Sequence, residues 1–371
     1  MNILDRIQKK LEQNGLDAIV AMTHDNVFYT SGAYIRTILS MRDRMVFTIF
    51  PKEGEPCLIA CSIEEGCTNK SWIKDIRLYT EFKDIPIKVF SDVIKEKGLE
   101  KGKIAIELDY LSYSVTTELF KELPDVEIFQ AKPIFDDLRM HKTEEELKLL
   151  RNAFLKTEKI IRSSFGLLGE GINEQLCAKT LINNLLQFGG ADDLAFISWS
   201  SGPENTMKAH GKPFDKKLRK GDHICLDVGG VFDGFRSDIA RVAVIGNPLH
   251  QQEDLFKLLK DIFSQSVEMF KPGIRVCDIF NFVKKEFDRH EDVIFDMPHV
   301  GHSTGIWGHE NPMINPYNTQ ELVSNGLYCL EIIVKKPGVG AFHIEDGIIV
   351  SNEGPELVSE SFPATELYIV K

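Results

Sequence analysis

The chain has 371 residues, more than one hydrophobic core usually organises, so two domains are expected. Hydrophobic residues make up 43% and charged residues 27%, as in ordinary globular proteins, and the formal net charge of −12 argues against nucleic acid as a main partner. No apolar run reaches the roughly 18 residues that a membrane span requires. The seven cysteines contain no Cys-x-x-Cys pair and the N-terminus lacks a signal-peptide pattern, so a cytoplasmic protein with reduced thiols is expected.

Helix and strand patterns alternate over the first part of the chain. This alternation predicts a three-layer α/β domain, in which helices cover both faces of a sheet. The predicted helices are residues 3–14, 90–97 and 112–123, and the predicted strands are residues 18–22, 44–50, 56–60, 103–107 and 126–130.

The second part of the chain begins with a helix-start signature. Thr143 and Glu146 form a capping box that opens a long amphipathic helix reaching to about residue 162. Helices interleaved with β-hairpins are typical of an α+β domain, in which helices cover a curved antiparallel sheet. We therefore expect one domain over residues 1–135 and another over residues 136–371. The further predicted helices are residues 171–188, 252–270 and 276–290.

The first predicted hairpin brings two aspartates together. Asp233 and Gly234 form a strong two-residue turn signal between β-rich runs, because both turn positions require φ > 0. With that turn, Asp227 opposes Ala240, and Asp238 lies on the same face with its Cβ roughly 7 Å from that of Asp227. Two metal ions can bridge such a separation. A bulge at the paired glycines of the first run would change the register. The two runs are residues 223–232 and 235–244.

The second predicted hairpin brings two glutamates together. Residues 327–335 and 341–350 are apolar strand patterns joined by residues 336–340. In this register Glu331 directly opposes Glu345, and like charges so placed are destabilising unless something positive binds between them. In the alternative arrangement, each glutamate faces solvent on its own strand.

A glycine-rich segment over residues 298–312 contains His299, His302 and His309, and we expect it to form a loop around a site. Grouped carboxylates that exclude water repel one another, so this grouping requires cations. The simplest arrangement for four carboxylates and one imidazole is a pair of divalent ions with shared ligands. The pattern therefore predicts a metal-dependent hydrolase whose ligands are Asp227, Asp238, His302, Glu331 and Glu345.

These residues stand in motifs that resemble those of the pita-bread metallohydrolases, the family of aminopeptidase P, prolidase, methionine aminopeptidase and creatinase. The N-terminal part, with Phe28-Tyr29-Thr-Ser-Gly32, resembles the first domain of the creatinase and prolidase branch. The resemblance implies an α/β N-terminal creatinase-like domain and an α+β C-terminal pita-bread catalytic domain. The motifs, in the family's order, are Asp227-Val-Gly229, Ser237-Asp238-Ile-Ala-Arg241, Gly301-His302-Ser-Thr-Gly305, Leu330-Glu331 and Ile344-Glu345-Asp346.

The resemblance also implies a role for each ligand. Asp238 and Glu345 would bridge two divalent ions, of which Mn²⁺ is the first expectation and Co²⁺, Zn²⁺ and Fe²⁺ are alternatives. Asp227 would bind one ion, and His302 and Glu331 would bind the other.

By the same resemblance, Glu331 would also act as general acid and base, while His210 and His309 would hold the substrate and stabilise the oxyanion. The implied reaction is hydrolysis of the amide bond before proline, in a dipeptide or at the N-terminus of a small peptide. The implied assembly is a homodimer, with residues 34–44 either approaching the partner's site or forming a surface loop.

The chain departs from the family pattern at two positions. The usual histidine four residues before His302 is Pro298, with His299 displaced by one, and the second departure is more informative. Aminopeptidase P and prolidase sequences commonly carry arginine two residues before the last glutamate, where this chain has His343. Without that guanidinium, capture of a substrate carboxylate is less favourable. Hydrolysis of a non-peptide amide or opening of a cyclic amidine is therefore the alternative activity. An inactive binding domain and a metal-free enzyme like creatinase are disfavoured, because all five ligands are present.

Overall fold

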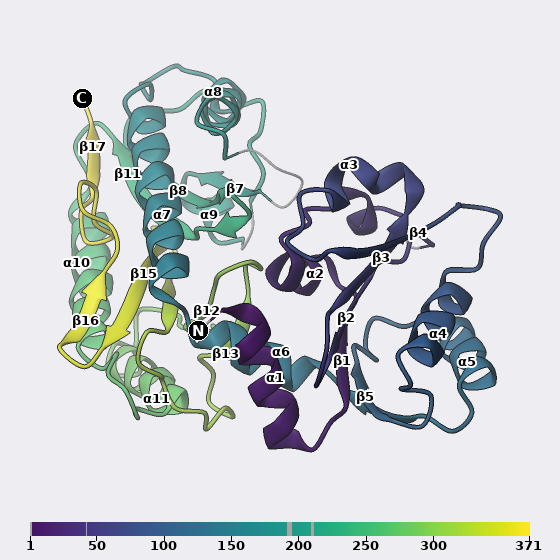
Figure 1. The fold of residues 1–371 in the computed structure, drawn as a ribbon. Coiled ribbons are helices and arrows are strands. Elements are labelled where there is room, and N and C mark those ends of the chain that lie inside the picture. The colour runs from purple at the N-terminus through teal and green to yellow at the C-terminus, as the bar shows by residue number, and fades with distance from the viewer. Residues whose placement is uncertain (1, 42, 191–194, 209–210) are drawn as a thin grey trace. The chain divides into compact units, whose positions relative to one another are not determined.

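The computed structural model describes residues 2–41, 43–190, 195–208 and 211–371 and divides into two compact units, Met1–Arg139 and Met140–Lys371 (Figure 1). The division falls at the end of helix α6 (Lys132–Met140), so the expected boundary at residue 135 lies inside this helix. Among the described residues, none of the helices combines the length and apolar character needed to cross a bilayer.

The first unit contains, within its described residues, a six-stranded sheet of mixed direction in the order β4-β3-β2-β1-β5-β6. Strand β2 runs antiparallel to both of its neighbours, β1 and β3, whereas the other neighbouring strands are parallel. The strands are β1 (Ala18–Ala21), β2 (Phe47–Pro51), β3 (Cys57–Cys61), β4 (Asp75–Tyr79), β5 (Lys103–Ile106) and β6 (Glu127–Gln130). The helices besides α6 are α1 (Ile3–Asn14), α2 (His24–Ser31), η1 (Arg36–Leu39), η2 (Ser62–Glu64), α3 (Glu65–Thr68), α4 (Pro86–Glu96) and α5 (Tyr113–Glu122).

The strand periodicity of two produces a separate core on each face of this sheet. In β1, Ile19 and Ala21 pack into one hydrophobic cluster with residues of α1, α2 and α6. Ala18 and Val20 point the other way, into a cluster with residues of α4 and α5. Two helical layers therefore enclose one sheet, which confirms the predicted three-layer α/β architecture.

The second unit contains, in its described part, a nine-stranded sheet whose main path is β13-β12-β14-β15-β11-β8-β7, with β16 beside β15 and β17 beside β11. A small hairpin, β9–β10, continues the turn between β8 and β11. The strands are β7 (Phe196–Ser201), β8 (His223–Gly229), β9 (Val231–Phe232), β10 (Phe235–Arg236), β11 (Ile239–Ile245), β12 (Gly301–Ser303), β13 (Glu310–Met313), β14 (Leu327–Lys336), β15 (Gly340–Ser351), β16 (Gly354–Leu357) and β17 (Tyr368–Val370).

Helices cover this sheet through two further hydrophobic clusters. Residues of α7 and α8 pack with strand residues in one cluster, and residues of α10 and α11 pack in the other. The predicted capping box is present, because the Thr143 side chain accepts from the Glu146 N–H and the Glu146 carboxylate accepts from the Thr143 N–H. The helices are α7 (Glu144–Phe165), α8 (Glu174–Gln187), α9 (Pro203–Thr206), α10 (His250–Val267) and α11 (Val276–Phe287).

Both predicted hairpins form in the expected register. Asp233 and Gly234 have φ of 52° and 82°, and Phe232 pairs with Phe235 across them. The paired glycines cause no shift, because Asp227 still pairs with Ala240. In the second hairpin Glu331 pairs with Glu345, and the ladder extends one pair beyond the expected end, to Lys336 and Gly340.

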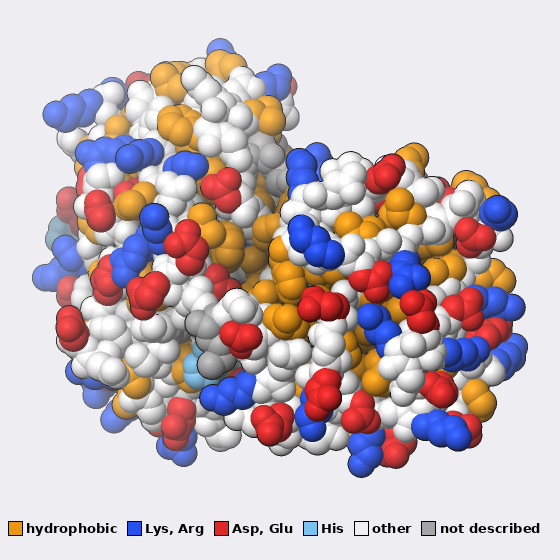
Figure 2. All heavy atoms as spheres, viewed as in Figure 1, with side chains coloured by type: hydrophobic (Ala, Val, Ile, Leu, Met, Phe, Trp, Pro, Cys, Tyr) orange, Lys and Arg blue, Asp and Glu red, His pale blue; other side chains and the backbone are white. Residues whose placement is uncertain are grey.

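The surface carries a mixture of charges. On the face shown in Figure 2, acidic and basic side chains are interspersed rather than gathered by sign. A binding surface for a polyanion would instead concentrate lysine and arginine. The described part of the face in this view shows no such concentration of basic side chains.

Candidate metal centre

A row of paired residues across four strands forms the base of the site. Asp227 on β8 pairs with Ala240 on β11, Ala240 pairs with Glu345 on β15, and Glu345 pairs with Glu331 on β14. Residues paired in this way project from the same face of a sheet. Three carboxylates therefore converge, and the small side chain of Ala240 leaves space between two of them.

His302 joins this row from the neighbouring strand. On β12 it pairs with Cys329, two residues before Glu331, and its Nε2 lies 3.5 Å from Glu345 Oε1. Its Nδ1 lies 3.0 Å from the Ser303 carbonyl oxygen. Because a carbonyl can only accept, Nδ1 carries the proton and Nε2 presents a lone pair to the carboxylates, as a metal ligand requires. The expectation that His302 lies in a loop is wrong, since strand pairing with β14 fixes its direction.

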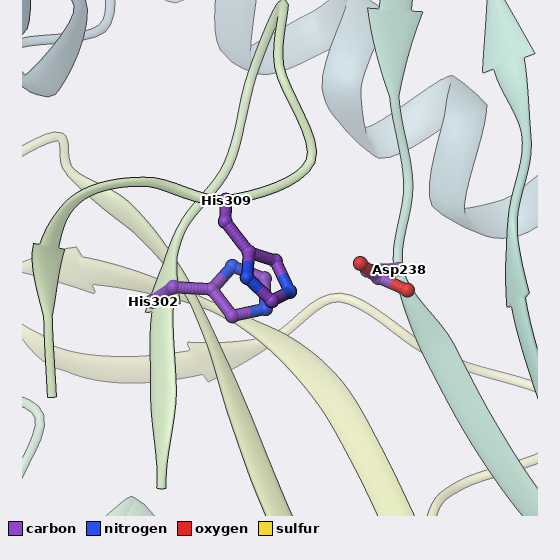
Figure 3. A group of neighbouring side chains, drawn as sticks. All are labelled: Asp238, His302 and His309. Carbon is purple, nitrogen blue, oxygen red and sulfur yellow. The ribbon is translucent and has the colours of Figure 1, made fainter. Parts of the chain in front are cut away.

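His309 lies over His302 at the front of the site. The ring centroids are 4.0 Å apart, and Figure 3 shows both rings directed toward Asp238. One ligand atom from each of these three residues falls in a group whose members are all within 4.8 Å of one another. Desolvation of the ring, followed by the proximity of His302, lowers the pKa of His309 to about 4. His309 is therefore neutral near pH 7.

A buried ion pair holds the turn that carries His309. One oxygen of Glu310, Oε1, accepts the backbone N–H groups of Ile306 and Trp307, both at 3.1 Å. The other, Oε2, accepts from Lys142 Nζ at 3.2 Å, and both side chains of the pair are buried. These contacts fix the segment between β12 and β13, so His309 and Trp307 have defined positions.

The buried carboxylates of the site have too few neighbouring positive charges to balance their own negative charge. Burial, followed by the neighbouring acidic groups, raises the pKa of Asp227 and of Glu345 well above the usual range, and burial also raises the pKa of Asp238. Asp227 Oδ1, Glu345 Oε1 and His302 Nε2 are buried and make no hydrogen bond with any described residue. Such groups are costly unless a cation binds them, so the donor set fits divalent metal ions.

Cys329 lies in the same cluster but is a poor ligand candidate. One of its ligand atoms lies within 4.8 Å of those of His302 and Glu345. Burial, followed by the nearby carboxylates, raises the pKa of the Cys329 thiol well above its usual value. The thiol is therefore protonated without a cation, and a soft thiolate donor would suit this oxygen-rich set less well than its carboxylates and imidazoles do.

Two histidines outside the predicted ligand set also contact the carboxylates. His343 Nε2 lies 3.3 Å from Glu331 Oε1, and His299 Nδ1 lies 3.7 Å from Glu331 Oε2. Burial alone raises the pKa of Glu331, but the three nearby imidazoles, with His343 first among them, outweigh it and hold that pKa at about 2. His343 could have been found from strand periodicity, because it is two residues from Glu345 and so shares its face.

A cavity of about 320 Å³ opens over the row of carboxylates. That volume suits a small ligand. Arg236, whose guanidinium carbon lies 5.8 Å from the Trp307 ring centroid, supplies positive charge to its wall, and Phe196 adds an apolar surface. The predicted catalytic residue His210 lies outside the described residues. The lining residues are Phe196, Asp227, Arg236, Asp238, Trp307, Gly308, His309, Glu331 and Glu345.

A second buried ion pair anchors the strands beneath the site. The Arg241 guanidinium donates to Asp346 Oδ2 at 2.9 Å and to the backbone oxygens of Glu345 and Phe362, each at 2.6 Å. Its side chain is 0% exposed and that of Asp346 is 1% exposed. Arg241 therefore positions the backbone of Glu345 without facing the cavity.

Two protein-family models match the chain. The model for metallopeptidase family M24 matches residues 148–352, and that for the creatinase/prolidase N-terminal domain matches residues 3–141. A putative dipeptidase of Bacillus subtilis is 25% identical over 356 residues, which are 95% of this chain and 96% of that protein. An Xaa-Pro dipeptidase of Pyrococcus horikoshii is 24% identical over 367 residues, which are 97% of this chain and 99% of that protein.

Solved structures share the two-domain fold. The prolidase from Pyrococcus horikoshii matches with a TM-score of 0.82 and 23% identity, over 97% of this chain and 99% of that one. An X-Pro aminopeptidase from Thermotoga maritima matches with a TM-score of 0.82 and 19% identity, over 98% of this chain and 100% of that one. These matches confirm the predicted combination of an α/β creatinase-like domain and a pita-bread domain.

Proposed function

Since the chain belongs to metallopeptidase family M24, we propose that it is a dinuclear metal-dependent peptidase that hydrolyses the amide bond before proline, in an Xaa-Pro dipeptide or at a peptide N-terminus. The observation that carries this proposal is the row of buried carboxylates joined by His302, with donor atoms that have no hydrogen bond among the described residues. The names of the relatives support the substrate class, because they include Xaa-Pro dipeptidases and an X-Pro aminopeptidase.

The ligand roles proposed are those that the family resemblance implies. We expect Asp238 and Glu345 to bridge the two ions, Asp227 to bind one of them, and His302 and Glu331 to bind the other. Mn²⁺ is the first ion to test. A pair of divalent ions supplies Lewis acidity and activates water near neutral pH.

Glu331 and His309 carry the proton chemistry and the charge stabilisation. Glu331 stays ionised near pH 7, since its pKa is held at about 2, so one of its oxygens accepts the proton of the attacking water and delivers it to the leaving amine. His309 stays neutral, with a pKa of about 4, so its ring N–H donates a hydrogen bond to the developing oxyanion. His210 lies outside the described residues, and its role of holding the substrate stays a prediction from the resemblance.

The cavity wall supports a substrate with a free carboxylate. Arg236 lines the cavity and is mostly buried. A guanidinium there replaces the positive charge that arginine at position 343 would have supplied, and arginine binds carboxylates with two hydrogen bonds. This feature favours a dipeptide, whose carboxylate lies one residue from the scissile bond. Because the chain has His343 in place of the usual arginine, a non-peptide amide remains the second candidate substrate.

The test is release of free proline, or of the N-terminal residue, from matched Xaa-Pro dipeptides and Xaa-Pro-Xaa tripeptides with added Mn²⁺. Cleavage of dipeptides alone identifies an Xaa-Pro dipeptidase, and cleavage of tripeptides identifies an aminopeptidase. A protein that binds two ions per chain and cleaves neither substrate would contradict the proposal and favour a non-peptide amide. His250→Gln is a matched control, because this exposed histidine lies on α10 outside the site.

We also infer a cytoplasmic homodimer. All seven cysteines are free, which fits a reducing compartment. Within the segment considered for partner contact, Arg44 is bound to Glu64 and Glu81 at 2.8 Å and 2.7 Å, so it is not available to a partner's site. Light scattering combined with size exclusion tests the assembly, and a mass of 42.1 kDa for the particle would contradict it.

A further inference from the structure

His343 brings a second imidazole nitrogen into the carboxylate cluster. Its Nε2 lies 3.3 Å from Glu331 Oε1 and 3.9 Å from Glu345 Oε2. A ligand atom of His343 also falls within 4.8 Å of those of Asp227 and Glu345. This Nε2 is buried and makes no hydrogen bond with any described residue. The nitrogen is therefore held among carboxylate oxygens without a conventional partner.

The ligand atoms of His343, Asp227 and Glu345 form a group close enough to draw in around one ion. The shorter 3.3 Å contact, by contrast, is with Glu331, which is expected on the other ion. Nitrogen and carboxylate donors lie about 2.0–2.2 Å from a divalent ion, so neighbouring donors on one ion stand roughly 3.0–3.5 Å apart. The pairing of Ile333 with His343 places the imidazole on the face of Glu345, two residue pairs along the same ladder. A hydrogen bond to Glu331 alone would leave the Asp227 and Glu345 oxygens without a counter-charge.

We propose that His343 is a further metal ligand, which binds through Nε2 the ion that Asp227 and Glu345 also bind. The proposal rests on the proposed function only in placing ions at this site. Because aminopeptidase P and prolidase sequences commonly carry arginine at this position, the extra ligand is a property of this chain. Each of the two ions then has one imidazole ligand, His302 for one and His343 for the other.

A second nitrogen ligand changes which ions the site prefers. Imidazole suits Zn²⁺ and Fe²⁺, whereas sites built from carboxylate and water suit Mn²⁺. His343 should therefore raise the affinity for Zn²⁺ relative to Mn²⁺. A cavity of about 50 Å³ borders His343, Asp227 and Ser198, so other side chains can be accommodated at position 343. This space makes His343→Gln and His343→Arg suitable variants.

Proton NMR of the Co²⁺-loaded chain in water tests the ligand directly. An imidazole that binds through Nε2 retains its Nδ1–H, which gives a strongly shifted, exchangeable resonance beside the paramagnetic ion. The wild-type chain should show two such resonances, and His343→Gln should show one. The control His250→Gln should show two, since that side chain is 85% exposed and lies outside the site. Metal content and the circular dichroism spectrum are measured on each sample, and His343→Arg serves if the glutamine variant does not fold.

Competition between Zn²⁺ and Mn²⁺ provides a second readout. Loss of an outer-shell partner already lowers metal affinity by about tenfold or more, so loss of a ligand should lower the Zn²⁺ affinity at least that far. The Zn²⁺-to-Mn²⁺ affinity ratio should fall as well, because imidazole suits Zn²⁺ better than Mn²⁺. A single shifted resonance in the wild-type chain would overturn the proposal. An unchanged number of resonances in His343→Gln and His343→Arg, or failure of the wild-type chain to bind Co²⁺, would also overturn it. Neither readout uses a substrate. Two resonances without peptide cleavage would contradict the proposed function alone, and peptide cleavage with one resonance would contradict the ligand alone.

Discussion

Replacement of Arg241 by methionine should destabilise the second unit strongly, although Arg241 does not line the cavity. The guanidinium is fully buried and is the cationic partner of Asp346, so its removal leaves a buried carboxylate without a counter-charge. Removing one partner of a buried ion pair costs about 3–5 kcal/mol. Domains of this size lose roughly 2–4 °C in melting temperature per kcal/mol, so the transition of this unit should fall by roughly 6–20 °C. Because the same guanidinium holds the Glu345 carbonyl, metal affinity should fall as well.

Thermal and urea unfolding of the metal-free protein, followed by intrinsic fluorescence and circular dichroism, measure the effect. The matched control is Arg151→Met in the same unit, whose ion pair with Glu356 is 37% and 49% exposed and should contribute under about 1 kcal/mol. The double variant Arg241→Met with Asp346→Asn should recover part of the loss, because the uncompensated charge is then absent. Equal effects of Arg241→Met and Arg151→Met would refute the assignment of a buried, structurally essential pair.

Three further predictions concern the site and its surroundings. Glu345→Gln should remove bound metal and lower kcat by a hundredfold or more, which is about the effect of losing one preorganised electrostatic contact. Elemental analysis and peptide assays measure both effects, and full activity would contradict a bridging role. Arg236→Gln should raise KM for Xaa-Pro dipeptides more than for tripeptides, in which the carboxylate lies farther from the scissile bond; equal changes would remove Arg236 from carboxylate binding. Burial lowers the pKa of His223 to about 4, from an unfolded value of 6.5. The unfolded state therefore binds a proton first as the pH falls, so the free energy of unfolding should decrease by roughly 3 kcal/mol between pH 6.5 and pH 4. Urea titrations across that range should show a flatter profile for His223→Gln, and an unchanged profile would assign the pH dependence to other groups.

The parts of the site determined by local turn chemistry could be predicted from the sequence. The positive φ values at Asp233 and Gly234 fix the register that pairs Asp227 with Ala240. The short loop of the second hairpin similarly fixes the pairing of Glu331 with Glu345. In both hairpins the residues that set the register are close to the turn, so no long-range information is needed.

The parts determined by long-range pairing could not be predicted in the same way. The strand that carries His302 is only three residues long and exists because it pairs with β14. The edge strand β4 was not predicted, because its residues are half-buried and give no clear apolar alternation. The cavity wall combines Phe196, Arg236 and Trp307 from three separate segments, which no local pattern connects. His343 was interpreted as a missing arginine, although its spacing from Glu345 already placed it on the site's face.

The row from Asp227 through Ala240 and Glu345 to Glu331 has a consequence for the order of events during folding. Its members belong to two hairpins that are far apart in the chain, so an unfolded or half-assembled chain has no preformed set of ligands. A slip of one residue in either hairpin would turn its carboxylates to the opposite face. Ions therefore bind only after β11 and β15 have paired correctly, and the time course of metal uptake during refolding reports when that central pairing is complete.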